Sequence, residues 1–201
     1  MLELQKLNKH FGGVRAVDGV DLTVARGEIL GLIGPNGSGK STIVNLICGL
    51  FPLTAGRILL DGADISELPP HARVALGIAR TFQNIRLFGQ LTVWQNLWVA
   101  QNSGDQRKQN FLPRWLGGSK GAREEIDRTL EFFDLAHKRD ELAASLAFGE
   151  QRRLEFARAL SAKPALLLLD EPAAGMNAEE VDQLDGRIRK MRQDGITVLL
   201  I

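Results

Sequence analysis

Hydrophobic residues form two kinds of strand pattern along the chain: in some segments they alternate with polar residues, and in others they form continuous runs. In "GVDLTVARG", Val20, Leu22 and Val24 alternate with polar neighbours, and "RILLDG" over 57–62 does the same before a turn signal. Both patterns predict strands with one buried face. The runs "EILGLI", "ALLLLD" and "ITVLLI" are continuously apolar instead. Such runs are typical of parallel strands that helices cover on both faces.

Three helices are predicted between these strands, because apolar residues recur there every three or four positions. The recurring residues are Ile43, Leu46, Ile47 and Leu50, then Ile126, Leu130 and Phe133, and finally Val181, Leu184, Ile188 and Met191. The order of strand, loop and helix predicts an α/β fold with right-handed crossovers.

The middle of the chain has a different pattern. Residues 85–160 carry little strand signal and several helical patterns, and 101–122 is a polar stretch with Gly, Pro and Ser. We expect a helical subdomain over 85–160 with a surface loop at 101–122, inserted into an α/β core of 1–84 and 161–201. The sequence stops at "TVLLI", within a strand pattern, so we expect the natural protein to continue.

Composition and charge argue against some classes of protein but do not indicate a ligand. The net charge is +1 over 201 residues, which gives no bulk electrostatic argument for nucleic acid. The single cysteine, Cys48, excludes an internal disulfide. The three histidines show no metal-ligand spacing, and neither a signal-peptide pattern nor an apolar run of membrane-spanning length is present. Any link to a membrane is therefore expected to go through a partner.

The stretch "GPNGSGKST" points to phosphate binding. It matches G-x-x-x-x-G-K-[ST] and stands between an apolar strand pattern and an amphipathic helix pattern. Glycines let successive main-chain N–H groups turn towards phosphate oxygens, Lys40 supplies a charge for the β and γ phosphates, and Ser41 offers Mg²⁺ a hard oxygen. A plain glycine-rich turn is the alternative. The candidate nucleotide-binding residues are Gly34, Pro35, Asn36, Gly37, Ser38, Gly39, Lys40, Ser41 and Thr42.

Two acidic residues end the run "ALLLLDE". Asp170 follows a predicted buried strand, and an acid at the carboxyl end of such a strand opens into the crevice where α/β sheets bind ligands. We expect Asp170 to hold Mg²⁺, through water, and Glu171 to orient or deprotonate the attacking water. The alternative is that both residues simply end the strand before Pro172.

The family is indicated by "LAFGEQRRLEFARAL", shortly before the acidic strand. No Asn-Lys-x-Asp follows the phosphate-binding loop, so guanine specificity has no support. The stretch resembles the signature motif of ABC ATPases, and Gln83, "PNGSGKST", "LLLLDEP" and "AAGMN" stand in the matching order. The resemblance covers the whole chain. "GIARTFQNIRLFGQLTVWQNL" and "LLLLDEPAAGMN" are particularly similar to the ATP-binding subunits of branched-chain amino acid importers, the LivG type.

The resemblance implies a fold and further site residues. The fold is an α/β P-loop NTPase (RecA-like) core with an N-terminal antiparallel β subdomain and an inserted α-helical subdomain. Phe11 matches the aromatic that stacks on adenine, although a core contact is the alternative. Gln83 matches the glutamine that reaches Mg²⁺ and the attacking water, as a metal ligand and catalytic residue together with Lys40 and Glu171.

The resemblance also implies a second ATPase subunit. Two chains, identical or related, would pack head to tail, with Ala147, Phe148, Gly149 and Glu150 facing the other chain's γ-phosphate. Ala147 replaces the usual Ser, so a hydroxyl donor is missing and main-chain N–H groups remain. Asn177 stands where Asp is usual and would touch the opposite subunit. The family's switch histidine would lie beyond "TVLLI", and a chain ending there would hydrolyse poorly.

The expected function is that of an ATP- and Mg²⁺-dependent motor subunit of an importer, located at the inner face of the cell membrane on transmembrane permease subunits. Residues 85–98, with Phe88, Trp94 and Trp98, are the expected docking surface, although these aromatics fit a subdomain core equally well. Two alternatives stay open: a soluble ABC ATPase without transport, and an ATP-dependent dimerisation switch with little turnover. The sustained heptads of the first alternative are absent.

Overall fold

The chain folds into two compact units. The computed structural model describes residues 1–81, 85–103 and 120–201. The first unit comprises Met1–Gln83 and Ala165–Ile201, and the second comprises Asn84–Pro164. The first unit is therefore built from two chain segments that the second unit separates in the sequence.

An antiparallel sheet forms one part of the first unit. Its strands are β1 (Leu2–Phe11), β2 (Val14–Val24), β4 (Ala55–Leu60) and β5 (Ala63–Asp64), in the order β2-β1-β4-β5. The alternating patterns predicted β2 and β4, whereas β1, which pairs with both, was not predicted. Its pattern is broken by irregular register between Leu4 and Leu7, where Lys6 has a positive φ of 45°. Such a bulge shifts which side chains face the core and so hides the period of two.

A parallel sheet forms the second part of this unit. Its strands are β3 (Ile29–Gly31), β6 (Ile78–Arg80), β7 (Leu166–Leu169) and β8 (Thr197–Leu200), in the order β3-β8-β7-β6. All three neighbouring pairs are parallel, as the continuous apolar runs predicted. The expectation of full cover is wrong for "EILGLI", because Ile29 and Leu30 of β3 are only half-buried and Gly31 is exposed. Ile33 is 95% exposed, because β3 ends at Gly31 and Ile33 already belongs to the loop that follows.

Three helices accompany these sheets. They are α1 (Lys40–Ile47), α2 (Pro70–Ala75) and α7 (Ala178–Gln193). The predicted faces of α1 and α7 are buried except at their ends. Leu50 is 47% exposed because α1 ends at Ile47, and Val181 is 39% exposed in the first turn of α7. The hydrophobic periodicity of a helix therefore does not predict whether residues beyond its end, or in its first turn, are buried.

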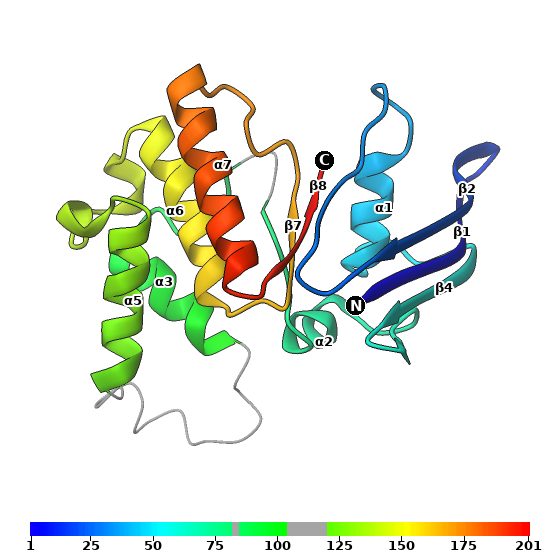
Figure 1. The fold of residues 1–201 in the computed structure, drawn as a ribbon, viewed down its shortest axis with the longest axis horizontal. Helices are drawn as coiled ribbons and strands as arrows, with labels where there is room; N and C mark the ends of the chain where they lie inside the picture. Colours follow the sequence, from blue (N-terminus) through cyan, green and yellow to red (C-terminus); the bar gives the residue numbers. More distant parts are fainter. Residues whose placement is uncertain (82–84, 104–119) are drawn as a thin grey trace. The chain divides into compact units, whose positions relative to one another are not determined.

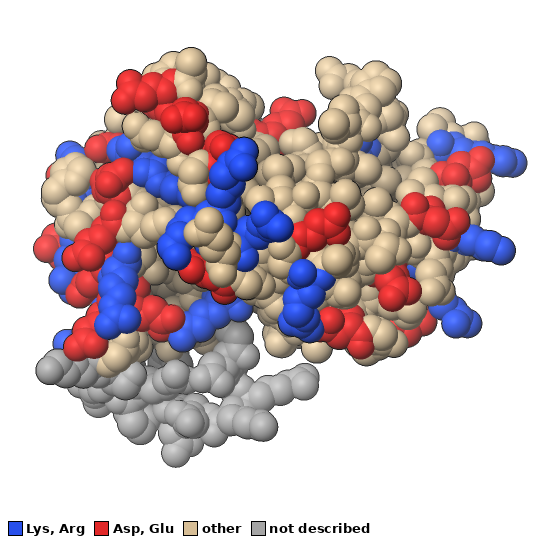
Figure 2. Space-filling view, in the orientation of Figure 1, with Lys and Arg blue, Asp and Glu red and all other residues tan. Residues whose placement is uncertain are grey.

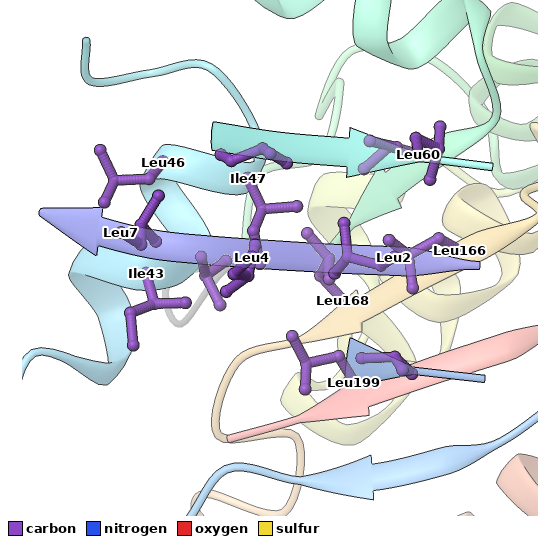
Figure 3. Close-up of a cluster of buried hydrophobic side chains, with 14 of the residues drawn as sticks. Leu2, Leu4, Leu7, Ile43, Leu46, Ile47, Leu60, Leu166, Leu168 and Leu199 are labelled. Carbon is purple, nitrogen blue, oxygen red and sulfur yellow. The ribbon is translucent and has the colours of Figure 1, made fainter. Parts of the chain in front are cut away.

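The core of the first unit joins both sheets through α1. Figure 3 shows Leu2, Leu4 and Leu7 of β1 converging with side chains of α1, β4, β7 and β8. The partners labelled there are Ile43, Leu46, Ile47, Leu60, Leu166, Leu168 and Leu199. Helix α1 is therefore held by its apolar face, and its N-terminal end is left to carry the loop before it.

A buried arginine closes the other end of α1. Arg73, in α2, is 2% exposed, and its guanidinium donates to the carbonyls of Leu46 (2.6 Å) and Ile47 (2.9 Å) in the last turn of α1. It also donates to the carbonyls of Ser66 (2.7 Å) and Leu68 (2.8 Å). The bonds to Leu46 and Ile47 thus add donors to carbonyls at the C-terminal end of α1, where a helix leaves its last carbonyls without the usual i+4 partner.

The second unit is helical. It contains α3 (Val93–Ser103), α5 (Lys120–Phe132), α6 (Phe148–Ser161) and two 3₁₀ turns, Ala136–Lys138 and Ala143–Ser145. Helices α3, α5 and α6 pack against one another (Figure 1), with the predicted residues Ile126, Leu130 and Phe133 at most 1% exposed. The predicted loop at 101–122 is wrong at its edges, because α3 runs to Ser103 and α5 starts at Lys120. Residues 104–119 lie outside the described part.

Candidate functional site

The loop predicted to bind phosphate connects β3 to α1 and depends on glycine. Gly37 and Gly39 have positive φ angles of 82° and 90°, a region that other residues rarely adopt. A Cβ on Gly39 would lie 2.2 Å from the carbonyl oxygen of Ala16. The N–H of Ser38 donates to the carbonyl of Pro35 at 3.2 Å, which closes a turn within the loop. The loop therefore curls tightly at the start of the helix.

Lys40 bends back over this loop. Its Nζ donates to the carbonyls of Gly34 (2.7 Å) and Pro35 (2.8 Å), so the ammonium group lies within the curl of the loop. Phosphate oxygens carry full negative charge and accept stronger hydrogen bonds than main-chain carbonyls. A nucleotide phosphate would therefore compete well for this ammonium group.

The N-terminal end of α1 is open to an anion. Gly39 is its N-cap, without a side-chain hydrogen bond, and no acidic residue lies in the first turn. The helix dipole and the unpaired N–H groups of such an end favour a bound anion. Ser41 lies in this first turn and is exposed. These features are compatible with the predicted phosphate cradle, and phosphate binding here stays a prediction.

The two acidic residues follow β7, whose four residues are fully buried. Asp170 is 5% exposed, and its Oδ2 accepts a hydrogen bond from Nη2 of Arg80 at 2.7 Å. Glu171 is exposed, has a positive φ of 46°, and its N–H donates to the carbonyl of Ile201 at 3.1 Å. For a residue other than glycine this backbone costs free energy, and such residues gather at functional sites.

Arg80 was missed by the sequence reasoning, and it forms a buried ion pair with Asp170. It ends β6, is 11% exposed, and its Nη1 donates to Oδ1 of Asn45 on α1 at 2.5 Å. The Cys48 thiol also lies in hydrogen-bonding contact with Arg80, and burial raises the pKa of Cys48 to about 11. The only local signal was an arginine at the end of a short apolar segment.

Two other candidate site residues, Phe11 and Gln83, belong to the first unit, and the structure describes only Phe11. Phe11 is 43% exposed, with the edge of its ring against Phe51 at 5.3 Å and the Lys9 ammonium 4.8 Å from its centroid. The ring is thus exposed and also contacts Phe51, which packs against the core, so adenine stacking and the core-contact alternative both stay open. Gln83 lies outside the described residues, so its two predicted roles are untested.

The donor set of this unit fits Mg²⁺ better than a fully protein-ligated metal. Among residues 1–81, 85–103 and 120–201, no group of three His, Cys, Asp or Glu side chains is placed to hold a metal. Mg²⁺ commonly uses one or two protein oxygens together with waters and substrate phosphates. Ser41, exposed in the first turn of α1, and Asp170, which follows β7, are oxygen donors of the kind that such a site uses.

The predicted signature motif opens α6 in the second unit. Ala147 is its N-cap, and the Glu150 Oε2 accepts the N–H of Ala147 at 2.9 Å. Because alanine has no side-chain oxygen, the N–H of Glu150 receives no cap in return. Phe148 is 61% exposed, so the first residue of the helix presents a large apolar side chain to solvent.

Asn177 has a local role that the sequence reasoning missed. It caps α7: its Oδ1 accepts the N–H of Glu180 at 3.0 Å, and the Glu180 carboxylate accepts the N–H of Asn177 at 2.9 Å. This is a full capping box. The signal was present as N-x-x-E, and the predicted contact of Asn177 with a second subunit is untested.

Surface charge and hydropathy add two observations. On the face shown in Figure 2, basic and acidic side chains are interspersed, in keeping with the net charge of +1. Among the described residues, no helix is long and apolar enough to cross a membrane.

Comparison with known proteins identifies the family. The family described as "ABC transporter" matches residues 17–174. The branched-chain amino acid transport ATP-binding protein BraF of Pseudomonas aeruginosa is 42% identical, over 100% of this chain and 81% of its own length. LivG of Escherichia coli, named for the same transport, is 40% identical over 100% of this chain and 80% of its own length.

Solved structures agree with the sequence relatives. The ADP conformation of an ABC transporter's ATP-binding cassette superposes with a TM-score of 0.85 at 31% identity, covering 100% of this chain and 80% of that one. A dimeric bacterial ABC transporter cassette superposes with a TM-score of 0.84 at 25% identity, covering 100% and 87%. The predicted fold is thereby confirmed. The chain therefore belongs to the ABC transporter family, as one of its ATP-hydrolysing cassettes.

Proposed function

We propose that the chain is the ATP-binding and ATP-hydrolysing motor subunit of an importer for branched-chain amino acids. The observation that carries the motor part is the loop between β3 and α1, where Lys40 lies within a glycine curl at an uncapped helix N-terminus. The names of BraF and LivG, which match the whole chain, support the cargo.

We propose a separate role for each candidate site residue, supported by the structure for all of them except Gln83, which lies outside the described residues. Lys40 and the N–H groups of the loop bind and orient the phosphates, while Phe11 supplies an exposed ring for the base. Ser41, Asp170 and Gln83 would hold Mg²⁺, which supplies positive charge beside the phosphates. Glu171 orients the attacking water and accepts its proton.

We further propose that two such cassettes close head to tail, with the N-terminal end of α6 in each facing the nucleotide of the other. The solved dimer of a related cassette supports the pairing. Ala147, Phe148, Gly149 and Glu150 would form the contact. Main-chain N–H groups at the start of α6 are the donors, since Ala147 contributes no hydroxyl.

The coupling to transport is proposed to pass through permease subunits at the inner face of the cell membrane. Residues 85–98 are the proposed docking surface. Phe88 is its most accessible aromatic, at 50% exposure, with the Arg158 guanidinium 5.4 Å from its ring. Trp94 and Trp98 are partly buried, so they contribute to the packing of the second unit as well.

The motor mechanism is tested with the Glu171→Gln variant by light scattering, with and without ATP and Mg²⁺. Loss of the base should preserve binding and block hydrolysis, so ATP should convert monomers into stable dimers. A variant that binds ATP and stays monomeric would rule out closure on an identical copy, and a related chain would then be the partner to seek.

The cargo is tested in cells that lack the ATP-binding subunit of their branched-chain amino acid importer. Expression of the wild-type chain should restore uptake of labelled leucine, and the Lys40→Met variant serves as the inactive control. Equal uptake with both, while the wild-type chain hydrolyses ATP, would contradict the cargo and leave the motor function intact.

A further inference from the structure

Arg80 joins the two elements that would hold the metal. Its Nη2 donates to Asp170 after β7, and its Nη1 donates to Asn45 on α1, over distances of 2.7 Å and 2.5 Å. Asn45 lies four residues after Ser41 on the same helix, so the two share one face of α1. One guanidinium group therefore spans from the strand that carries Asp170 to the helix that carries Ser41.

The setting of this bridge is buried. The side chains of Arg80 and Asp170 are 11% and 7% exposed, and the Cys48 thiol contacts the guanidinium from α1. In such a place a charge pair is costly unless its hydrogen bonds are complete. The planar fork of arginine meets both acceptors at once, whereas the ammonium of lysine is a compact point charge that cannot reproduce the fork.

We propose that Arg80 is a positioning residue of the metal site. By bonding Oδ2 of Asp170, Arg80 leaves Oδ1 as the carboxylate oxygen that could serve Mg²⁺, and by bonding Asn45 it ties Asp170 to the helix that carries Ser41. This inference rests on the proposed function, in which Ser41 and Asp170 serve Mg²⁺. Groups that orient a metal ligand commonly change metal affinity by 10–100-fold when they are lost.

Geometry and charge predict opposite results for a lysine at this position. If only the positive charge near Asp170 mattered, Arg80→Lys would behave as the wild type. If the fork matters, Arg80→Lys loses the link to Asn45, and Asp170 is free to turn. The Asn45→Leu variant tests the same link from the α1 side and leaves the charge of Arg80 in place.

The experiment is a titration of the ADP-bound protein with Mn²⁺, followed by electron paramagnetic resonance, because Mn²⁺ reports on a Mg²⁺ site without turnover. We expect the Mn²⁺ dissociation constant to rise about tenfold for Arg80→Lys and for Asn45→Leu. Arg26→Met is the matched control, since Arg26 forms an exposed ion pair with Asp61 in the same unit. It should leave the Mn²⁺ constant unchanged.

Two further measurements distinguish a loss of metal positioning from a general loss of nucleotide binding. ADP affinity without a divalent ion should change by less than about twofold in all variants, and excess Mg²⁺ should restore phosphate release in Arg80→Lys. Wild-type-like Mn²⁺ binding in Arg80→Lys or in Asn45→Leu would overturn the positioning role. A wild-type protein that binds neither ADP nor Mn²⁺ would instead refute the proposed function itself.

Discussion

Two helices begin at the segments proposed to bind phosphate, and their ends are built in opposite ways. Helix α1 starts at an uncapped Gly39 without an acidic residue in its first turn, and its C-terminal end is held by Arg73. Helix α6 starts at Ala147, whose N–H is already bound by the carboxylate of Glu150. The positive end of α1 is left uncompensated, whereas that of α6 carries its own negative charge.

The difference indicates different tasks for the two helix ends. An uncompensated N-terminal end binds an anion more strongly than one that carries a carboxylate. We therefore expect α1 to hold the nucleotide through the whole cycle and α6 to make a weaker contact that is broken in each cycle.

The first prediction removes the charge at the N-terminal end of α1. Lys40→Met should lower the rate of phosphate release by about 10²–10³-fold, because a charged donor within the phosphate-binding loop is lost. Phosphate release by purified protein measures this. Lys190→Met, which breaks the exposed pair of Lys190 with Asp194, is the control and should keep the wild-type rate. A near-normal rate for Lys40→Met would contradict the proposal that the N-terminal end of α1 holds the nucleotide more strongly than that of α6.

The second prediction releases the other end of α1. Arg73→Met should lower the free energy of unfolding by about 3 kcal/mol, because four main-chain carbonyls lose the guanidinium as a donor, two of them in buried hydrogen bonds. Urea denaturation measures this, with Arg26→Met expected to cost less than about 1 kcal/mol as an exposed pair. Equal losses in both variants would mean that Arg73 does not anchor α1.

The third prediction concerns pH and the C-cap of α1. Burial raises the pKa of the Cys48 thiol from 9.0 to about 11, so the folded state holds this proton more tightly than the unfolded chain. The stabilising contribution is complete below about pH 9 and is lost as the pH rises towards 11. At pH 10 the wild type should have lost roughly 1 kcal/mol of stability relative to Cys48→Ala.

Urea denaturation of both proteins between pH 8 and pH 10, in the presence of a reducing agent, measures this difference. The Cys48→Ala protein serves as the reference, because it shares every other group that titrates over this range. Parallel pH profiles would show that the thiol at the end of α1 is not sealed from water.

The smallest expected effect lies at α6. In the Glu171→Gln background, Glu150→Gln should strengthen the ATP-dependent dimer by about two- to fivefold, because it removes one negative charge from a helix N-terminus that faces phosphate. The glutamine oxygen can still accept the N–H of Ala147. Asp185→Asn changes the net charge equally on α7 and is the control, and sedimentation at graded protein concentrations gives the constants. A weaker dimer would reverse the roles of the two helices.

The sequence predicted the fold well where residue types are dictated by local chemistry. The glycine loop, the continuous apolar strands and the amphipathic helices are each specified within about ten residues, and the fold class that they imply is confirmed. Errors occurred at Ile33, Leu50 and Val181, at or near the ends of elements. At these positions an apolar residue is exposed, although the hydrophobic pattern of the neighbouring element predicts that it is buried.

The candidate site was predictable only in part. Lys40, Ser41, Asp170 and Glu171 were found because their motifs are short, although their roles stay predictions. Arg80 was not found because its carboxylate partner is 90 residues away in the sequence and its partner on α1 is 35 residues away. Bonds of this kind depend on sheet order and packing, which no local pattern encodes.

The bonds of Arg73 to the last turn of α1 have a consequence for affinity. An isolated helix of eight residues does not form in water, because nucleating it fixes more torsions than its few hydrogen bonds repay. In this chain, packing in the core and the hydrogen bonds of Arg73 offset that entropic cost during folding, before any nucleotide binds. Binding then does not have to order the helix, so more of the interaction free energy with phosphate is expressed as affinity.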